Sequence, residues 1–278
     1  MRPLTTDRLF INLCSVFCIL YSPSAFAWDY TFHEQNTTNS MQIRVGAEVS
    51  KKWNNGLRLH FEEDLRSDVY NSSFGASFKT SHTTLSLSYL PIEYVRFDVG
   101  YTLKINGPQS DWTAEKKADP NEWIRHRAFA SVTGIYQTQY IKLSLRERFL
   151  MEARTDSVNL DEKSKYAWQL RSKLGLDIYP PGKPLKPYIW CELINTLNAP
   201  EFQQKNGRQF ITSVRAQAGL KWRVSRLSSL DFYYRFTYGY NRDINVNKKY
   251  YTDGDLKLTL TEETLFQHAI GVIYCLDW

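Results

Sequence analysis

The sequence has few residues of the kinds that cross-link, kink or break a chain. Of its 278 residues only four are cysteine, and two of these, Cys14 and Cys18, lie near the start. A chain of this length with Cys191 and Cys275 as its other thiols is not a disulfide scaffold. A bridge between these two requires their strands to be neighbours, and the alternative is a pair of free thiols. With 13 glycines and 10 prolines, collagenous and low-complexity classes are excluded as well.

Long hydrophobic runs are also missing. A membrane-spanning helix needs about twenty apolar residues, and the apolar run at residues 9–21 covers only thirteen. Two arginines precede this run and the small-residue site Ala-Phe-Ala at 25–27 follows it, which is the arrangement of a cleaved secretory signal. We therefore predict a signal peptide over residues 1–27 and one domain over residues 28–278.

Neither sign of charge dominates, although 35 Lys and Arg against 29 Asp and Glu leave a formal net charge of +6. Such a surplus suits nucleic acid, an anionic surface or an anionic solute. The basic residues alternate with apolar ones and do not cluster, so we do not expect nucleic acid as a partner. Histidines and cysteines lack metal-ligand spacing, and no phosphate loop or dinucleotide fingerprint is present, so we expect no cofactor.

What the sequence has in abundance is alternation of polar and apolar residues, the period of a strand with one apolar face. In the segment 94–104, for example, Val95, Phe97 and Val99 alternate with Arg96, Asp98 and Gly100. The segments with this period are 41–53, 57–66, 83–90, 94–104, 123–136, 140–152, 166–179, 188–195, 208–222, 229–240 and 264–278.

The length of these segments indicates what their apolar faces contact. Strands of soluble sheets average about five or six residues, whereas most of these segments match the nine to eleven or so tilted residues that cross a bilayer. Their apolar faces end in Tyr, Trp and Phe, as the girdles of membrane barrels do. We predict an all-β, antiparallel transmembrane β-barrel, integral to the outer membrane of a Gram-negative cell, with the lipid bilayer as its partner.

Connections alternate between short and long, which predicts orientation and parity. The short ones are at 54–56, 91–93, 137–139, 179–185 and 224–227, and the long ones near 67–81, 105–122, 153–164, 197–206 and 241–262. Outer-membrane barrels have short periplasmic turns and an even number of strands. We therefore expect periplasmic chain ends and about twelve strands, with residues 28–34 as the additional strand. An extra hairpin within 241–262 is the alternative.

The C-terminal segment carries a second pattern. Every second residue from Phe266 onward faces the same way, ending with Tyr274, Leu276 and Trp278. A terminal strand of this kind is similar to the assembly signal that the barrel-insertion machinery reads, and we expect that machinery as a partner.

Several longer motifs add a family resemblance. They are KKWNNGL at 51–57 with 62–66, LRSKLGL at 170–176 with 186–188 and Glu192, VRAQAGL at 214–220, LDFYYR at 230–235, and 268–278. With these motifs the chain resembles an outer-membrane β-barrel family known as domain of unknown function 2490. The resemblance covers nearly the whole chain after residue 27. It implies a closed antiparallel barrel without an assigned activity, and it implies no catalytic residues.

If the apolar residues face lipid, the alternate positions face the lumen, and basic residues outnumber acidic ones among them. The candidate lumen-facing charges are Arg44, Arg58, Arg96, Arg125, Arg127, Arg146, Arg148, Arg171, Arg215, Arg235, Glu48, Glu62, Asp98, Glu192 and Asp231. In so narrow a space most of them must form cross-strand ion pairs or contact water.

Two functions fit this inward face. Surplus Arg and Lys can line a narrow aqueous path that prefers small anionic solutes, or ion pairs can fill the lumen of a closed structural or interaction barrel of the cell envelope. A barrel hydrolase needs a Ser and a His close together on an outward face. His82 lies beside Ser81 in an expected outer loop, where histidine is ordinarily solvated, so we do not expect an enzyme.

Overall fold

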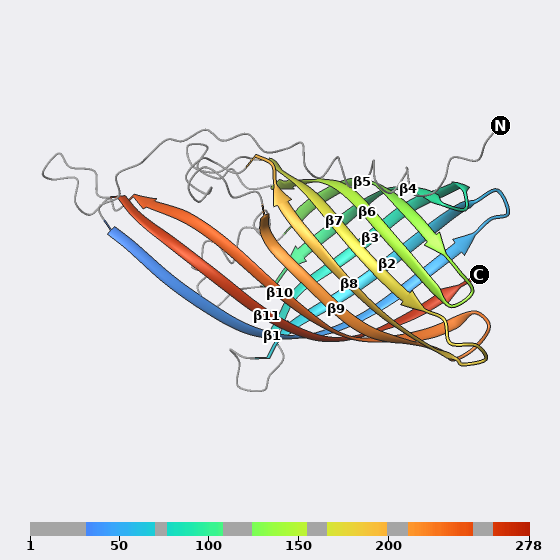
Figure 1. Cartoon of the computed structure of the whole chain (residues 1–278). Coiled ribbons are helices and arrows are strands. Elements are labelled where there is room, and N and C mark those ends of the chain that lie inside the picture. The colour runs from blue at the N-terminus through green and yellow to red at the C-terminus, as the bar shows by residue number, and fades with distance from the viewer. Residues whose placement is uncertain (1–31, 70–76, 108–123, 155–165, 199–210, 247–257) are drawn as a thin grey trace, which may run out of the picture.

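The computed structural model describes residues 32–69, 77–107, 124–154, 166–198, 211–246 and 258–278. The predicted signal peptide at 1–27 lies outside these ranges. The described part of the chain is all strand and turn (Figure 1). In chain order the strands are β1 (Phe32–Lys52), β2 (Leu57–Asp68), β3 (Ser77–Ile92), β4 (Val95–Asn106), β5 (Ile124–Gln137), β6 (Ile141–Arg154), β7 (Tyr166–Ile178), β8 (Leu185–Thr196), β9 (Ile211–Arg223), β10 (Ser228–Val246) and β11 (Leu258–Asp277).

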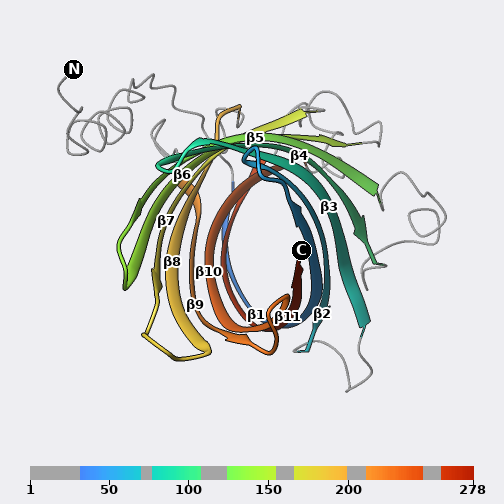
Figure 2. The same cartoon turned by 90° about the vertical axis from the view of Figure 1, so that its right-hand side faces the viewer.

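The strands form one closed barrel. Each strand pairs antiparallel with the next in sequence, and β1 pairs with β11 to complete the ring. Figure 2 looks along the barrel from the end that carries the tight turns and shows the strands arranged around it. The prediction of an all-β closed barrel is therefore confirmed, and each of the eleven alternating segments contributes one strand.

The predicted twelfth strand is wrong within the described residues. Phe32 to Lys52 is one continuous strand of 21 residues, so the part of the proposed extra strand that is described belongs to β1. The alternative hairpin within 241–262 is not found among the described residues, because β10 and β11 pair directly with each other up to Val246 and Leu258. Residues 247–257 lie outside the described ranges. With eleven strands, the first and last run in the same direction, so β1 and β11 pair in parallel from Phe32↔Thr259 to Ser50↔Asp277.

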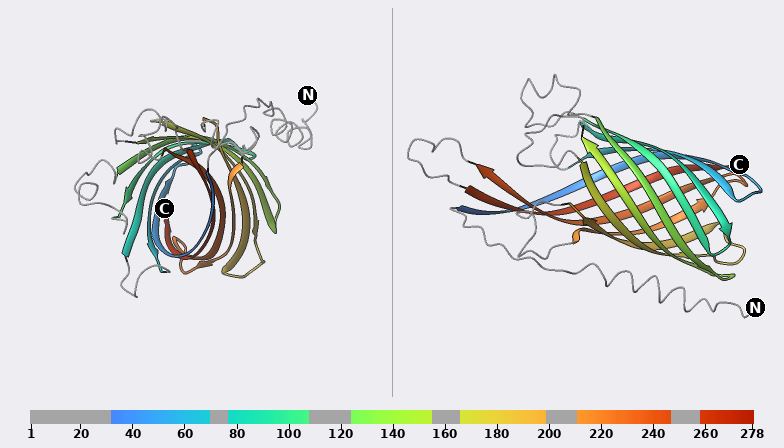
Figure 3. Two further views of the ribbon diagram at one scale, coloured as in Figure 1. Left: turned by 90° about the vertical axis from the view of Figure 1, so that its left-hand side faces the viewer. Right: turned by 90° about the horizontal axis from the view of Figure 1, so that it is seen from above.

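The odd parity also changes the expected position of the chain ends. β1 begins at the end with the long connections, whereas Trp278 lies at the end with the tight turns (Figure 1). Strand β1 therefore begins at the opposite end of the barrel from the one where β11 finishes, contrary to the expectation that both chain ends are periplasmic. Residues 1–31 lie outside the described ranges. Strands β1, β10 and β11 extend beyond the others as a three-stranded ribbon (Figures 1 and 3). Polar pairs such as Thr38 with Glu263, at 3.0 Å, join the ribbon's strands.

The tight turns lie where the short connections are predicted. The first follows β1, where Gly56 has a φ of 82° and its N–H donates to the Trp53 carbonyl at 3.3 Å. Residues other than glycine rarely adopt this backbone conformation. The other tight turns join β3 to β4, β5 to β6, β7 to β8 and β9 to β10.

The barrel has the reverse of a soluble protein's polarity. Large apolar side chains are exposed on the outside, for example Leu85 at 52%, Val99 at 55% and Ile189 at 54%. Polar and charged side chains are buried inside, including Arg44 at 3% and Glu192 at 4%. Exposing this much apolar surface to water would be unfavourable in free energy. The exterior is therefore suited to an apolar surrounding.

Two glycines let aromatic side chains pack against the inner wall. A Cβ at Gly219 would lie 2.4 Å from the Tyr188 ring, and one at Gly271 would lie 2.2 Å from the Tyr233 ring. Each tyrosine covers the backbone of its neighbouring strand, a contact that stabilises glycines in sheets. These rings occupy part of the interior and narrow it.

The two cysteines of the barrel are free. Cys191 is exposed on β8, and Cys275 is buried on β11. Strand β8 pairs with β7 and β9, so the two thiols are not on neighbouring strands. Of the two interpretations left open by the sequence, the pair of free thiols is the one observed.

Candidate functional site

The charged interior of the barrel is the candidate site, and its charges come from alternate positions of nearly every strand. One carboxylate at mid-barrel collects three guanidinium groups. Glu192 on β8 lies 3.1 Å from Arg146 of β6, 2.9 Å from Arg171 of β7 and 3.6 Å from Arg215 of β9. A single negative charge thus lies among three positive charges and offsets only part of them. Because both partners are out of bulk water, the cluster is held by charge-assisted hydrogen bonds.

Two similar clusters lie farther from the tight turns. Glu152 accepts a hydrogen bond from Arg127 at 2.5 Å and one from Arg125 at 3.2 Å. Asp64 lies 2.6 Å from Arg66 and 4.0 Å from Arg44. In each cluster two guanidinium groups share one carboxylate, so positive charge again exceeds negative charge.

A fourth cluster joins β3, β4 and β5. Asp98 lies 3.0 Å from Arg96 and accepts a hydrogen bond from Ser88 at 2.5 Å. Beside it, the guanidinium of Arg148 lies over the Phe129 ring at 4.0 Å. A cation over an aromatic face is stabilised without a counter-charge.

A smaller group lies where β1, β2 and β11 meet, with three carboxylates around Arg58 and His60. Arg58 lies 2.6 Å from Asp277 and 3.8 Å from Glu48. His60 lies 3.4 Å from Glu48 and 3.8 Å from Glu62. A cavity of about 320 Å³ is lined by Glu48, Arg58, His60 and Glu62 together with Arg96, Asp98, Arg146 and Arg148. Thirteen of the fifteen charges predicted for the lumen lie in these clusters or line this cavity, and the other two, Asp231 and Arg235, line a larger cavity.

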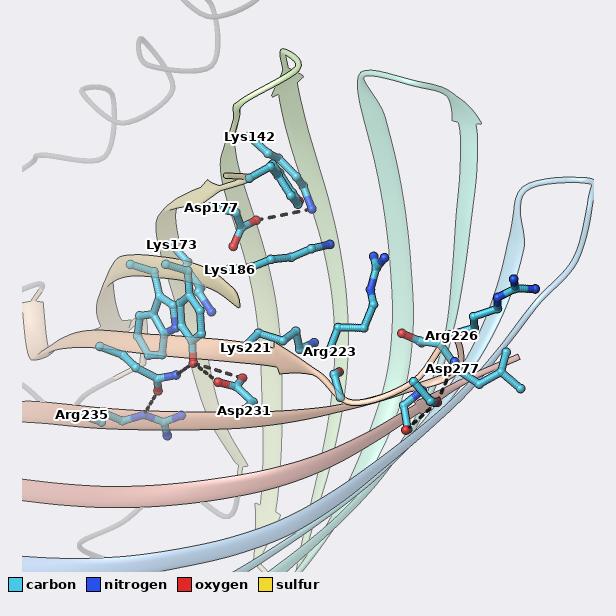
Figure 4. Close-up of a pocket in the computed structure, with 18 residues that line it drawn as sticks. Lys142, Lys173, Asp177, Lys186, Lys221, Arg223, Arg226, Asp231, Arg235 and Asp277 are labelled. Atoms are coloured by element: carbon cyan, nitrogen blue, oxygen red, sulfur yellow. Dashed lines mark hydrogen bonds and ion pairs between the residues drawn. The ribbon is translucent and has the colours of Figure 1, made fainter. Parts of the chain in front are cut away.

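The larger cavity, of about 490 Å³, opens at the tight-turn end. Its lining has seven cationic side chains and three carboxylates. These charged residues are Lys142, Lys173, Lys186, Lys221, Arg223, Arg226, Arg235, Asp177, Asp231 and Asp277 (Figure 4). Burial, and after it the charge of Asp177, raise the pKa of the Tyr179 phenol in the adjoining turn. The phenol therefore stays neutral and does not offset the cations.

Several residues of this cavity were not among the predicted site residues. Tyr188 donates to Asp231 at 2.9 Å and accepts from Gln217 at 2.6 Å. Gln217 in turn accepts from Arg235 at 2.7 Å. These polar residues follow the same period-two pattern as the predicted charges. The alternation could have identified them, but a search restricted to charge left them out.

Three histidines of the described barrel have a tyrosine or an arginine as their partner. On the outer face His126 is hydrogen-bonded to Tyr101, and His268 to Tyr234 at 2.6 Å. The expected loop position of His82 is wrong, because His82 lies within β3, buried beside Arg66 at 3.0 Å. The Ser- and Thr-rich residues around it made the strand resemble a loop.

The C-terminal residues lie on the closing seam. Tyr274 and Trp278 are exposed on the outside at 46% and 57%, and Leu276 lies opposite Val49 of β1. The Trp278 N–H donates to the Ser50 carbonyl at 3.0 Å, and its own carbonyl accepts from Lys52 at 2.9 Å. The terminal residue is thus part of the ladder that closes the ring.

Comparison with known proteins places the chain in a family. The family described as "Protein of unknown function (DUF2490)" matches residues 37–248, more than half of the chain. The chain belongs to the DUF2490 family. This family membership confirms the resemblance seen in the sequence and supplies no activity.

Among solved structures, this DUF2490 chain is similar to the NanC porin, with 10% identity and a TM-score of 0.44. The match covers 70% of this chain and 86% of that one. No curated protein matches the sequence. Over the described ranges, no group of three His, Cys, Asp or Glu residues could hold a metal ion. The same ranges contain no helix long and apolar enough to cross a membrane.

Proposed function

We propose that this DUF2490 protein is an outer-membrane β-barrel that forms a narrow, anion-preferring channel. The exterior supports the membrane part of the proposal. Side chains such as Leu87, Phe97 and Ile270 are 43 to 51% exposed, and burying them in hydrocarbon removes that apolar surface from water. Aromatic residues at the tight-turn end, including Tyr94, Trp222 and Trp278, suit the membrane interface.

The observation that carries the channel is the charge of the cavity at the tight-turn end. Seven Lys and Arg side chains against three carboxylates surround about 490 Å³ of space. Rings of basic side chains favour anions in aqueous pores because they lower the energy of a negative ion and raise that of a positive one. Beyond this cavity, the Glu192 cluster also carries more positive than negative charge.

Planar-bilayer recording in a KCl gradient tests the channel. We expect a small conductance whose reversal potential shows preference for chloride. Lys221 has no ion pair among the described residues and lines the cavity, so Lys221→Glu should move the reversal potential toward potassium. Lys183→Glu makes the same charge change in the exposed turn between β7 and β8, outside the cavity, and should leave it unchanged. A well-folded protein without current, or with potassium preference, would reject the channel.

A closed structural or interaction barrel is the second candidate, and the Glu192 cluster favours it. Arg146, Arg171 and Arg215 reach one carboxylate from three strands, and such a belt can obstruct the lumen at mid-height. If the belt closes the barrel, the wild type carries no current while Glu192→Ala with Arg171→Ala does. If the belt leaves a path, both conduct.

A further inference from the structure

The cavity at the tight-turn end is more than a widened part of the lumen, because its seven cations outnumber its three carboxylates, and among the described residues only Lys142 is paired with one of them. Two of the three carboxylates lie beside a cation, and the third accepts a hydrogen bond from a phenol. Asp177 lies 3.7 Å from Lys142, Asp231 accepts from Tyr188 at 2.9 Å, and Asp277 lies 2.6 Å from Arg58.

Six cations of the same lining have no ion pair among the described residues. They are Lys173, Lys186, Lys221, Arg223, Arg226 and Arg235. In Figure 4 Lys142, Lys186 and Lys221 extend into the same cavity from β6, β8 and β9. Several like charges around one space repel each other, and the repulsion is relieved when a counter-charge enters.

Aromatic and amide groups hold two of these cations in place. Trp190 lies between them, with the Lys173 ammonium 3.9 Å and the Arg235 guanidinium 5.2 Å from the centre of its ring. Arg235 also donates to Gln217 at 2.7 Å, and Gln217 donates to Tyr188. The positive groups are therefore positioned before any ligand enters, which lowers the entropy cost of binding.

We propose that this cavity is a binding site for small multivalent phosphate anions, with Lys173, Lys221 and Arg235 as its principal contacts. A monovalent anion would offset only one of the unpaired cations, whereas a di- or triphosphate brings several charges close together. Lysine suits the non-planar oxygens of phosphate as a compact point charge, and arginine adds paired donors. The site deepens the proposed channel by naming the anions that its tight-turn end holds.

Calorimetric titration of the detergent-purified full-length protein with tripolyphosphate tests the site without any current measurement. We expect saturable binding that weakens as salt is raised, because exposed charge interactions are screened. Lys173→Gln with Lys221→Gln should weaken binding about tenfold or more. Arg226→Gln, in the exposed turn of the same lining, should weaken it about twofold to threefold without disturbing a strand.

Lys183→Gln is the matched control, because it removes a lysine at the same barrel end outside the cavity, and its affinity should equal that of the wild type. Absence of saturable binding by the wild type, or equal affinity of all variants, would overturn the site. Binding without any bilayer current would retain the site and reject the channel. Current without tripolyphosphate binding would reject the site and retain the channel.

Discussion

The backbone of Trp278 is hydrogen-bonded to that of Ser50, with the Trp278 nitrogen 3.0 Å from the Ser50 carbonyl oxygen. This contact continues the parallel β1–β11 pairing to the final residue. The Trp278 carbonyl accepts a second bond from Lys52. The two bonds hold the point where the first and last strands meet.

Deleting Trp278 should therefore destabilise the closed barrel. Loss of two backbone hydrogen bonds costs about 1 to 3 kcal/mol in the free energy of unfolding. Urea titration measures this loss, with the folded fraction at each urea concentration determined by electrophoresis of unheated samples. Trp278→Phe keeps both backbone bonds and an aromatic ring, so it should stay close to the wild type. Equal loss in both variants would show that the ring, and not the seam, determines stability.

A charged residue on the outer face should destabilise the barrel in lipid. Ile270 lies on β11 with 51% of its surface exposed, and Ile270→Arg should cost about 2 to 4 kcal/mol of stability in lipid if the residue faces the bilayer core. Val224, 54% exposed in the turn before β10 and outside the cavity, serves as the control, because arginine near the interface costs about 0 to 1 kcal/mol. Folding into lipid vesicles measures both. Equal costs would contradict the membrane exterior.

The sequence was sufficient for the eleven alternating strands and for a closed barrel, and insufficient for the parity of the strands and the parallel direction of the closing pair. Alternation identifies a strand wherever one face is apolar, as at Val95, Phe97 and Val99. The beginning of β1 lacks this signal because Gln35 to Ser40 are all polar, and their strand conformation comes from pairing with β11. Whether the number of strands is even or odd depends on whether that segment forms a separate strand or continues β1. A segment of polar residues alone carries no pattern that distinguishes the two.

Part of the candidate site could also be predicted from the sequence, and part could not. The charged positions follow from the period of each strand, but which acid serves which bases depends on register. Glu192 reaches Arg146 two strands away, a contact that no spacing along the chain predicts. His82 was misplaced because the polar residues on both sides of it, from Lys79 to Thr84, give this part of β3 no apolar alternation.

Removing the central carboxylate should leave its three arginines in excess. Glu192→Gln keeps the shape of the side chain, and the loss of a buried charge partner costs about 3 to 5 kcal/mol. Adding Arg171→Gln should recover part of that loss, because one uncompensated cation is removed as well. Denaturant titrations of the single and double variants measure the coupling. Additive losses would show that the pair at 2.9 Å contributes little.

The glycine at 219 should not tolerate a methyl group. A Cβ there would lie 2.4 Å from the Tyr188 ring, so Gly219→Ala must displace the tyrosine and its hydrogen bonds to Asp231. We expect a loss of about 1 to 3 kcal/mol in thermal or urea unfolding. Gly239→Ala is the control, since its nearest neighbour would be at 3.5 Å. A neutral Gly219→Ala would mean that Tyr188 moves freely.

The environment of Cys191 tests the central claim most directly, because this exposed thiol lies near the middle of β8 on the apolar side of the barrel. A nitroxide attached to Cys191, in a Cys275→Ser protein reconstituted into vesicles, reports which solvent surrounds it. If the outer face contacts lipid, the label should collide often with oxygen, which concentrates in hydrocarbon, and rarely with a water-soluble nickel chelate. Frequent collision with the nickel chelate and little with oxygen would place the apolar face in water and contradict the account.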